Sequence, residues 1–182
     1  MGLPDNSLDR YLELLAKVDS FTERVLGAYR GHIACGPGCH ECCGNTFTVF
    51  AVEAYHLRFG FDTLLPDLKE KIAGRCRSHR QDQPCPLLED GLCALYAFRP
   101  IICRTHGYPF TSSHIRVGKH RVTSFCEWNF NGMPDLSALS SEHILNLDLL
   151  NSALAAINHL FIKKQDTGST SERVWLPSAI LR

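Results

Sequence analysis

The sequence has no long hydrophobic run. No stretch of it approaches the roughly 20 consecutive apolar residues that a helix needs to cross a bilayer, so no membrane partner is expected. Its opening, MGLPDNSLDRYLELL, carries Asp5 and Asp9 where a secretion signal would carry positive charge. We therefore expect a protein that stays in the cytoplasm.

An excess of positive charge is also lacking. Lys and Arg total 19, Asp and Glu total 19, and the formal net charge is zero. Such a chain has no overall field to attract nucleic acid, and no basic helix lies next to the cysteines described below. The sequence thus disfavours zinc-finger-like recognition of nucleic acid.

The chain has neither an internal repeat nor a low-complexity segment, and its composition is that of a globular protein. It has 182 residues, of which 45% are hydrophobic and 21% are charged. That length is sufficient for one domain with a hydrophobic core. We expect a single domain over residues 1–182.

Cysteine, by contrast, is abundant. Nine cysteines without a secretion signal indicate a reducing compartment, where disulfides rarely persist, and an odd number would leave one thiol unpaired. Four of them lie within nine positions in ACGPGCHECCGN, residues 34–45: Cys35, Cys39, Cys42 and Cys43. Buried apolar thiols are the alternative, and that reading suits Cys76 in the polar segment GRCRSHR. Thiolates crowded as closely as the first four repel one another unless a cation neutralises them, which favours a metal centre.

Hydrophobic spacing predicts several helices. Apolar residues three and four apart predict a helix over 7–29 with Asn6 or Ser7 as its N-cap. Another is expected within 46–61, ending near Gly60, and a short one after Pro66. The longest remaining pattern, over 140–164, has a buried stripe of Ile144, Leu147, Leu150, Leu154, Ile157 and Phe161.

Two hairpins are expected, the first turning at Asp90-Gly91 and the second at Gly118-Lys119. The tail, 166–182, begins as a polar link and ends in apolar residues that we expect to dock on the body. Together these patterns predict a mainly α protein with small β-hairpins (α+β), a single metal-stabilised domain with a loop-borne cysteine cluster. Its parts are a cysteine-cluster core over 35–126 and packing helices within 1–34 and 135–165.

The spacing of Cys35, Cys39 and Cys42 lets three sulfurs converge on one centre, as in structural zinc and iron–sulfur sites. Adjacent Cys42 and Cys43 usually point apart, so one of them can serve a different metal. The same spacing matches the tripod of radical S-adenosylmethionine enzymes. Nothing in the chain reads as the repeated strand–helix units of their barrel, which makes an iron–sulfur-dependent, methyl-transfer-type enzyme the less favoured reading.

The chain resembles the YkgJ-type cysteine-cluster family, which carries a CxxCxxCC signature and is described as zinc- or iron-chelating. The resemblance runs from 35 to 126 and rests on the first cysteines, CPLL at 85–88, GLCALYAFRPIICR at 91–104 and a late cysteine. Three residues, not two, separate Cys35 from Cys39. Some lysine methylases acting on flagellin carry a similar domain. The resemblance implies eight metal ligands, with Cys76 left out: Cys35, Cys39, Cys42, Cys43, Cys85, Cys93, Cys103 and Cys126.

Eight thiolates could fill two four-ligand sites, or one cluster and one single-metal site. The absence of regularly spaced histidine favours an iron–sulfur cluster, whereas His32 and His40 beside the cysteines keep Zn²⁺ open. The protein would then be either a structural zinc protein or metal store without catalysis, or an iron–sulfur component with a redox or accessory-enzyme role and a protein redox partner.

Charged and aromatic residues follow the first hairpin. Arg99 and Arg104 could stabilise a negatively charged thiolate site as neighbouring guanidinium groups, or simply solvate the surface. Glu53 is expected on a solvated helix face. We expect the aromatic side chains nearby to shield the metal from water: Tyr96, Phe98, Tyr108 and Phe110.

Overall fold

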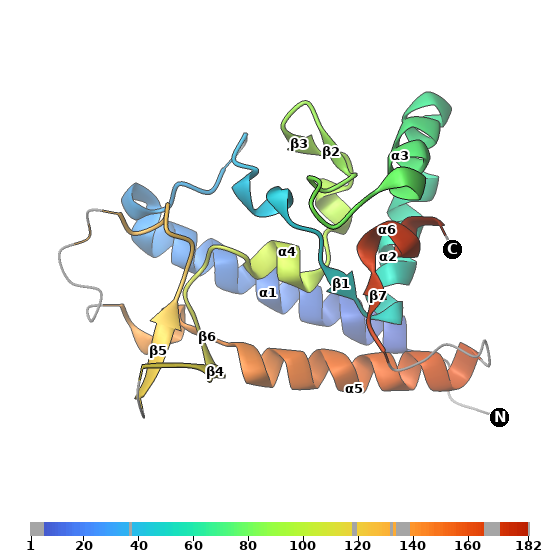
Figure 1. Ribbon diagram of the computed structural model, residues 1–182. Coiled ribbons are helices and arrows are strands. Elements are labelled where there is room, and N and C mark those ends of the chain that lie inside the picture. Colours follow the sequence, from blue (N-terminus) through green and yellow to red (C-terminus); the bar gives the residue numbers. More distant parts are fainter. Residues whose placement is uncertain are drawn as a thin grey trace.

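The computed structural model describes residues 6–36, 38–117, 120–131, 133, 139–165 and 172–181. Within them the chain is mainly helical, with β-sheets of two or three strands (Figure 1). The helices are α1 (Ser7–Tyr29), α2 (Ala51–Asp62), α3 (Pro66–Ser78), α4 (Ile101–Thr105), α5 (Leu147–Gln165) and α6 (Leu176–Leu181). The strands are β1 (Thr48–Val49), β2 (Leu88–Glu89), β3 (Leu92–Cys93), β4 (Phe110–Val117), β5 (His120–Ser124), β6 (Leu145–Asn146) and β7 (Val174–Trp175). The predicted fold class is confirmed.

Helix α1 spans the predicted residues. Its apolar stripe is buried against α4 and α5, and Figure 1 shows α1 and α5 running along the base of the molecule with α4 above α1. Asn6 occupies the N-cap position, although its side chain makes no capping hydrogen bond. The buried stripe comprises Tyr11, Leu15, Val18, Phe21 and Val25.

Helix α5 begins at Leu147 and not near residue 140 as predicted. A 3₁₀ turn at Ser141–His143 precedes β6, which pairs in parallel with the start of β4. The Asn146 side chain then accepts a hydrogen bond from the Leu149 amide at 3.0 Å and caps the helix. The main-chain pairing with β4 therefore removes residues 145–146 from the helix although their apolar pattern continues it.

Both predicted hairpins are present. Asp90 (φ 48°) and Gly91 (φ 78°) form the left-handed turn between β2 and β3 that an Asp-Gly pair favours. Strands β4 and β5 are antiparallel, and the predicted turn at 118–119 lies outside the described residues.

The end of the chain docks on the body, as predicted. Strand β7 pairs with β1, and α6 packs against α2 and α3. Leu176 and Ile180 are buried there in one hydrophobic cluster with Cys76, which is 4% exposed. This packing fixes the side of the molecule that carries the cysteines. Among the described helices, none combines the length and the apolar character that crossing a membrane requires.

Candidate metal centre

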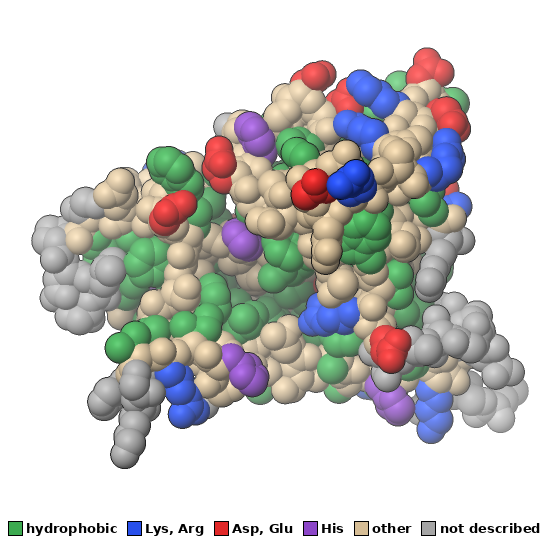
Figure 2. All heavy atoms as spheres, in the orientation of Figure 1, with side chains coloured by type: hydrophobic (Ala, Val, Ile, Leu, Met, Phe, Trp, Pro, Cys, Tyr) green, Lys and Arg blue, Asp and Glu red, His purple; other side chains and the backbone are tan. Residues whose placement is uncertain are grey.

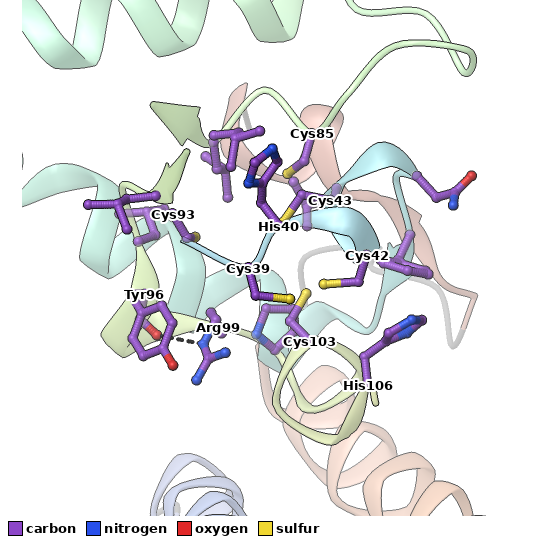
Figure 3. A pocket seen from close by; sticks show the side chains of 18 of the residues that line it. Cys39, His40, Cys42, Cys43, Cys85, Cys93, Tyr96, Arg99, Cys103 and His106 are labelled. Atoms are coloured by element: carbon purple, nitrogen blue, oxygen red, sulfur yellow. Dashed lines mark hydrogen bonds between the residues drawn. The ribbon is translucent and has the colours of Figure 1, made fainter. Parts of the chain in front are cut away.

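Six of the eight predicted cysteines line a single pocket of about 90 Å³. Cys39, Cys42 and Cys43 come from the segment between α1 and β1, Cys85 and Cys93 from the first hairpin, and Cys103 from α4. Figure 3 shows the labelled side chains arranged around the pocket, with the sulfurs of Cys39, Cys42 and Cys103 toward its middle. All nine cysteines, each among the described residues, are free thiols.

The first cysteine segment is folded by tight turns. Gly38 adopts φ 87°, a conformation that suits glycine, and the His40 ring nitrogen Nδ1 lies 2.8 Å from the Gly38 carbonyl oxygen. The Cys43 amide donates to the His40 carbonyl at 2.8 Å, within a 3₁₀ turn at Glu41–Gly44. These bonds bring three thiols from five consecutive residues, 39–43, to the same pocket.

The hairpin cysteines are fixed by main-chain hydrogen bonds. The Cys85 amide donates to the Cys43 carbonyl at 2.7 Å, which joins the hairpin to the first segment. The amides of Leu87 and Leu95, two residues beyond each cysteine, donate to the sulfurs of Cys85 and Cys93. N–H donors aimed at sulfur stabilise its thiolate form, the form that binds metal.

Cys103 is positioned through Glu53, and the expectation that Glu53 lies on a solvated face is wrong. Glu53 is 1% exposed, and its carboxylate accepts hydrogen bonds from the amides of Phe50 (2.9 Å) and Ile101 (3.1 Å). It thus satisfies free amides at the starts of both α2 and α4. One buried carboxylate therefore sets the position of α4 against α2.

In the metal-free protein, burial favours the neutral thiol at most of these positions. Burial raises the pKa of Cys85 to about 11 and also raises the pKa values of Cys93 and Cys103. The hydrogen bond between Cys42 and Cys43 raises the pKa of Cys42 and lowers that of Cys43, which is therefore the first of the pair to ionise. A bound cation would instead favour the thiolate form, because metal binding displaces the thiol protons.

In the part of the chain that the structure describes, no three Cys, His, Asp or Glu side chains already converge closely enough to hold a metal ion. Neutral thiols have no mutual attraction that would draw them together. The donor set nevertheless fits zinc or iron, because six sulfurs and the imidazoles of His40 and His106 line the same pocket. His32 is absent from the pocket lining.

Cys35 and Cys126 do not line the pocket, although Cys35, whose pKa burial raises, is near enough to Cys39 and Cys42 for their charges to raise it further; the two residues meet at Gly107 and Asn129. Asn129 is 1% exposed; its Oδ1 accepts from the Ala34 amide at 2.9 Å, and its Nδ2 donates to the Gly107 carbonyl at 2.7 Å and to the Cys35 sulfur at 3.4 Å. A side chain at Gly107 (φ 97°) would bring its Cβ within 2.9 Å of that sulfur and 3.6 Å of the Cys126 Cβ. Sequence reasoning missed Gly107 and Asn129, although an asparagine three residues after a cysteine was the available signal.

The two predicted arginines are placed differently. Arg99 lines the pocket, its guanidinium stacks over the Tyr96 ring at 3.5 Å, and its charge partly offsets the burial that raises the pKa of Cys103. Arg104 instead forms an ion pair with Asp19 at 2.6 Å and donates to the Arg99 carbonyl at 2.8 Å. Arg104 therefore joins α1 to the pocket wall without lining the pocket itself.

The apolar wall of the pocket also differs from the expectation. Tyr96 lines it, whereas Phe98 packs on Gly60, and Tyr108 and Phe110 are absent from the lining. The apolar lining comes instead from residues of several elements: Phe47, Leu57, Leu87, Leu95 and Leu176.

Comparison with known proteins agrees with this site. No curated protein and no solved structure matches the chain. A family model named CxxCxxCC and described as "Putative zinc- or iron-chelating domain" matches residues 34–127, about half of the chain, and these residues contain the six pocket cysteines together with Cys35 and Cys126. The chain belongs to this CxxCxxCC family.

Proposed function

We propose that this protein binds an iron–sulfur cluster through the cysteines of the pocket. The observation that carries the proposal is the meeting of six cysteines from three separate segments in one pocket. Iron–sulfur clusters take thiolate ligands almost exclusively, and sulfur is the predominant donor here. Cys39, Cys42, Cys43, Cys85, Cys93 and Cys103 would hold the cluster, which supplies one-electron redox chemistry when bound.

Zinc is the second candidate, and a specific observation favours it. His40 and His106 line the same pocket, and structural zinc sites often combine cysteine with histidine. Cys35 and Cys126 are not among the residues that line the pocket, and their role as metal ligands stays a prediction.

The position of the pocket supports a redox or accessory role with a protein partner. Cys39 is exposed and Tyr96, at the pocket edge, is 61% exposed, so the centre would lie near the surface. Exposure of this kind supports electron exchange with a docked protein. Arg99 beside the thiolates would offset part of their negative charge.

Metal analysis of protein purified without oxygen tests the proposal. Iron, acid-labile sulfide and a brown colour with visible absorption would support the iron–sulfur cluster. A colourless protein with about one or two zinc ions would support the second candidate. Protein that contains neither metal when purified in this way would overturn both.

Two serine substitutions locate the site. Cys39→Ser should lose most of the metal, because it removes a pocket thiol. Cys76→Ser is the matched control, since Cys76 is buried in the core beside α6 and lies outside the pocket lining. Loss of metal from the Cys76 variant alone would contradict the assignment.

A further inference from the structure

A second hollow lies beside the thiol pocket, between α4, the end of β5 and the start of α5. Its volume is about 290 Å³, and a neighbouring cavity of about 210 Å³ continues it, because Phe47, Ile102, Thr105 and Leu147 line both. Figure 2 shows this face hollowed above α5, with hydrophobic side chains in the depression. A volume of this size is within the range of small-molecule sites.

The larger cavity is mostly apolar. Its apolar lining comes from a residue before β1 and from the stretch from α4 to the start of α5: Phe47, Ile102, Phe110, Phe125, Leu145 and Leu147. Water in such a space gains little from its surroundings, so an apolar group that displaces it gains free energy in proportion to the area it buries. Phe47 and His106 also line the thiol pocket, so the hollow and the candidate metal centre are neighbours.

One positive charge lies at the smaller cavity. Arg173 lines it, donates to the Thr48 carbonyl and the Asn151 side chain, each at 3.3 Å, and stacks over the Phe50 ring at 4.1 Å. Within the described ranges no carboxylate lies within ion-pair distance of Arg173. A guanidinium held in this way keeps N–H groups free for an anion.

The acidic residue of the cavity, Glu53, is influenced by the charge of Arg173, which lowers its pKa against the larger effect of burial, but no hydrogen bond joins their described side chains. Both oxygens of Glu53 accept main-chain amides, from Phe50 and Ile101. Burial raises the pKa of the Glu53 carboxyl, and the two amides that it accepts and the charge of Arg173 act in the opposite direction.

We propose that this hollow binds an aliphatic monocarboxylate, with its chain in the apolar cavity and its carboxylate on Arg173. One guanidinium matches one carboxylate in charge and in its two-point hydrogen-bonding geometry, whereas a dianionic phosphate would need further cations. The site goes beyond metal binding, although two candidate metal ligands, His106 and Cys126, also line the larger cavity.

Calorimetric titration of the protein as purified, with its metal, tests the proposal with three probes. Octanoate should bind with one molecule per chain and about tenfold more tightly than octanol, since a hydrogen bond to a charged group is worth at least that factor. Acetate, which lacks the chain, should give no measurable heat. Equal affinities for octanoate and octanol, or no binding of either, would overturn the proposal.

Substitutions separate the two halves of the site. Arg173→Gln should weaken octanoate about tenfold and leave octanol unchanged. Arg58→Gln is the matched control, because Arg58 also lies over a phenylalanine ring and donates to a main-chain carbonyl, but far from either cavity lining. Ser124→Leu should fill the larger cavity and weaken octanoate and octanol alike, with circular dichroism used to verify folding. An Arg173 variant that binds octanoate as the wild type does would refute the role of the guanidinium. Since the readout is heat of ligand binding, a failure here is distinguishable from an absence of metal.

Discussion

Replacement of Asn129 by alanine should destabilise the protein and loosen its hold on metal. Asn129 is 1% exposed and joins three segments, since it bonds to Ala34, Gly107 and Cys35. Truncation leaves the Ala34 amide without this partner, whereas the Gly107 carbonyl still accepts from the Cys126 amide at 3.3 Å. An unsatisfied polar group costs about 1–3 kcal/mol, so the expected loss in the free energy of unfolding is about 1–3 kcal/mol.

The effect on metal depends on Cys35, which lies outside the lining of the six-cysteine pocket and which the family resemblance implies as a ligand. The Asn129 amide is 3.4 Å from Cys35 Sγ, and removal of a group that orients a ligand commonly lowers metal affinity about 10- to 100-fold. Competition with a chromophoric chelator measures this change, and urea denaturation followed by circular dichroism measures stability.

Asn158→Ala provides the control. Asn158 is equally buried, and its side chain accepts a hydrogen bond from the Val52 amide at 3.1 Å, remote from the cysteines. It should cost about 1–3 kcal/mol of stability and leave the metal affinity of the folded protein unchanged. If the two variants lose metal equally, or if Asn129→Ala keeps the wild-type affinity, the inference that Asn129 positions a metal ligand is refuted.

Three further predictions concern the scaffold. Gly107→Ala should lower stability by about 1–2 kcal/mol because of its left-handed backbone alone, and the new Cβ should displace Cys35. Gly31→Ala is the control and should cost little, because its Cβ would meet no neighbour. Denaturation measures the stability of each variant, and metal analysis measures its metal content. Glu53→Gln should cost most stability near pH 4.5 and progressively less as the pH rises. A carboxyl with a raised pKa keeps its proton in the folded state, and the stability that this proton contributes is lost as the pH rises through the folded-state pKa. Urea denaturation at a series of pH values from 4.5 upward measures how the free energy of unfolding changes with pH. Ile180→Ala should cost about 2–5 kcal/mol because Ile180 is 0% exposed, whereas Leu181→Ala, at an exposed position, should cost far less.

Local patterns predicted the elements that local forces determine. The residues of α1 repeat an apolar stripe at every third and fourth position, and Asp90-Gly91 can form its turn without help from distant residues. The start of α5 was missed because the apolar pattern around Leu145 suits a helix as well as a strand, and Leu145 lies in β6, which pairs with β4. The β1–β7 pairing joins residues 48–49 to 174–175, and no spacing rule reaches so far along the chain.

The candidate site shows the same division. Cysteine spacing predicted a shared centre, but not that six cysteines would line one pocket while Cys35 and Cys126 lie outside its lining. Glu53 was assigned to a solvated face because AVEAYHL contains no sign of the α4 amide that its carboxylate accepts. Partners of buried polar groups lie far away in the sequence, so they become visible only in the folded chain.

The segments that bear the six pocket cysteines are not equally supported by the rest of the protein. Cys85 and Cys93 pack against the hydrophobic cluster of α2, α3 and α6, and Cys103 is carried by a helix whose start is fixed by Glu53. The segment from Cys39 to Cys43 contributes no buried side chain, and its turns are closed mainly by its own hydrogen bonds. The free energy of metal binding stabilises the fold mainly in segments that other contacts do not already hold in place. It would therefore act chiefly on this segment, and the helical body would persist when the metal is removed.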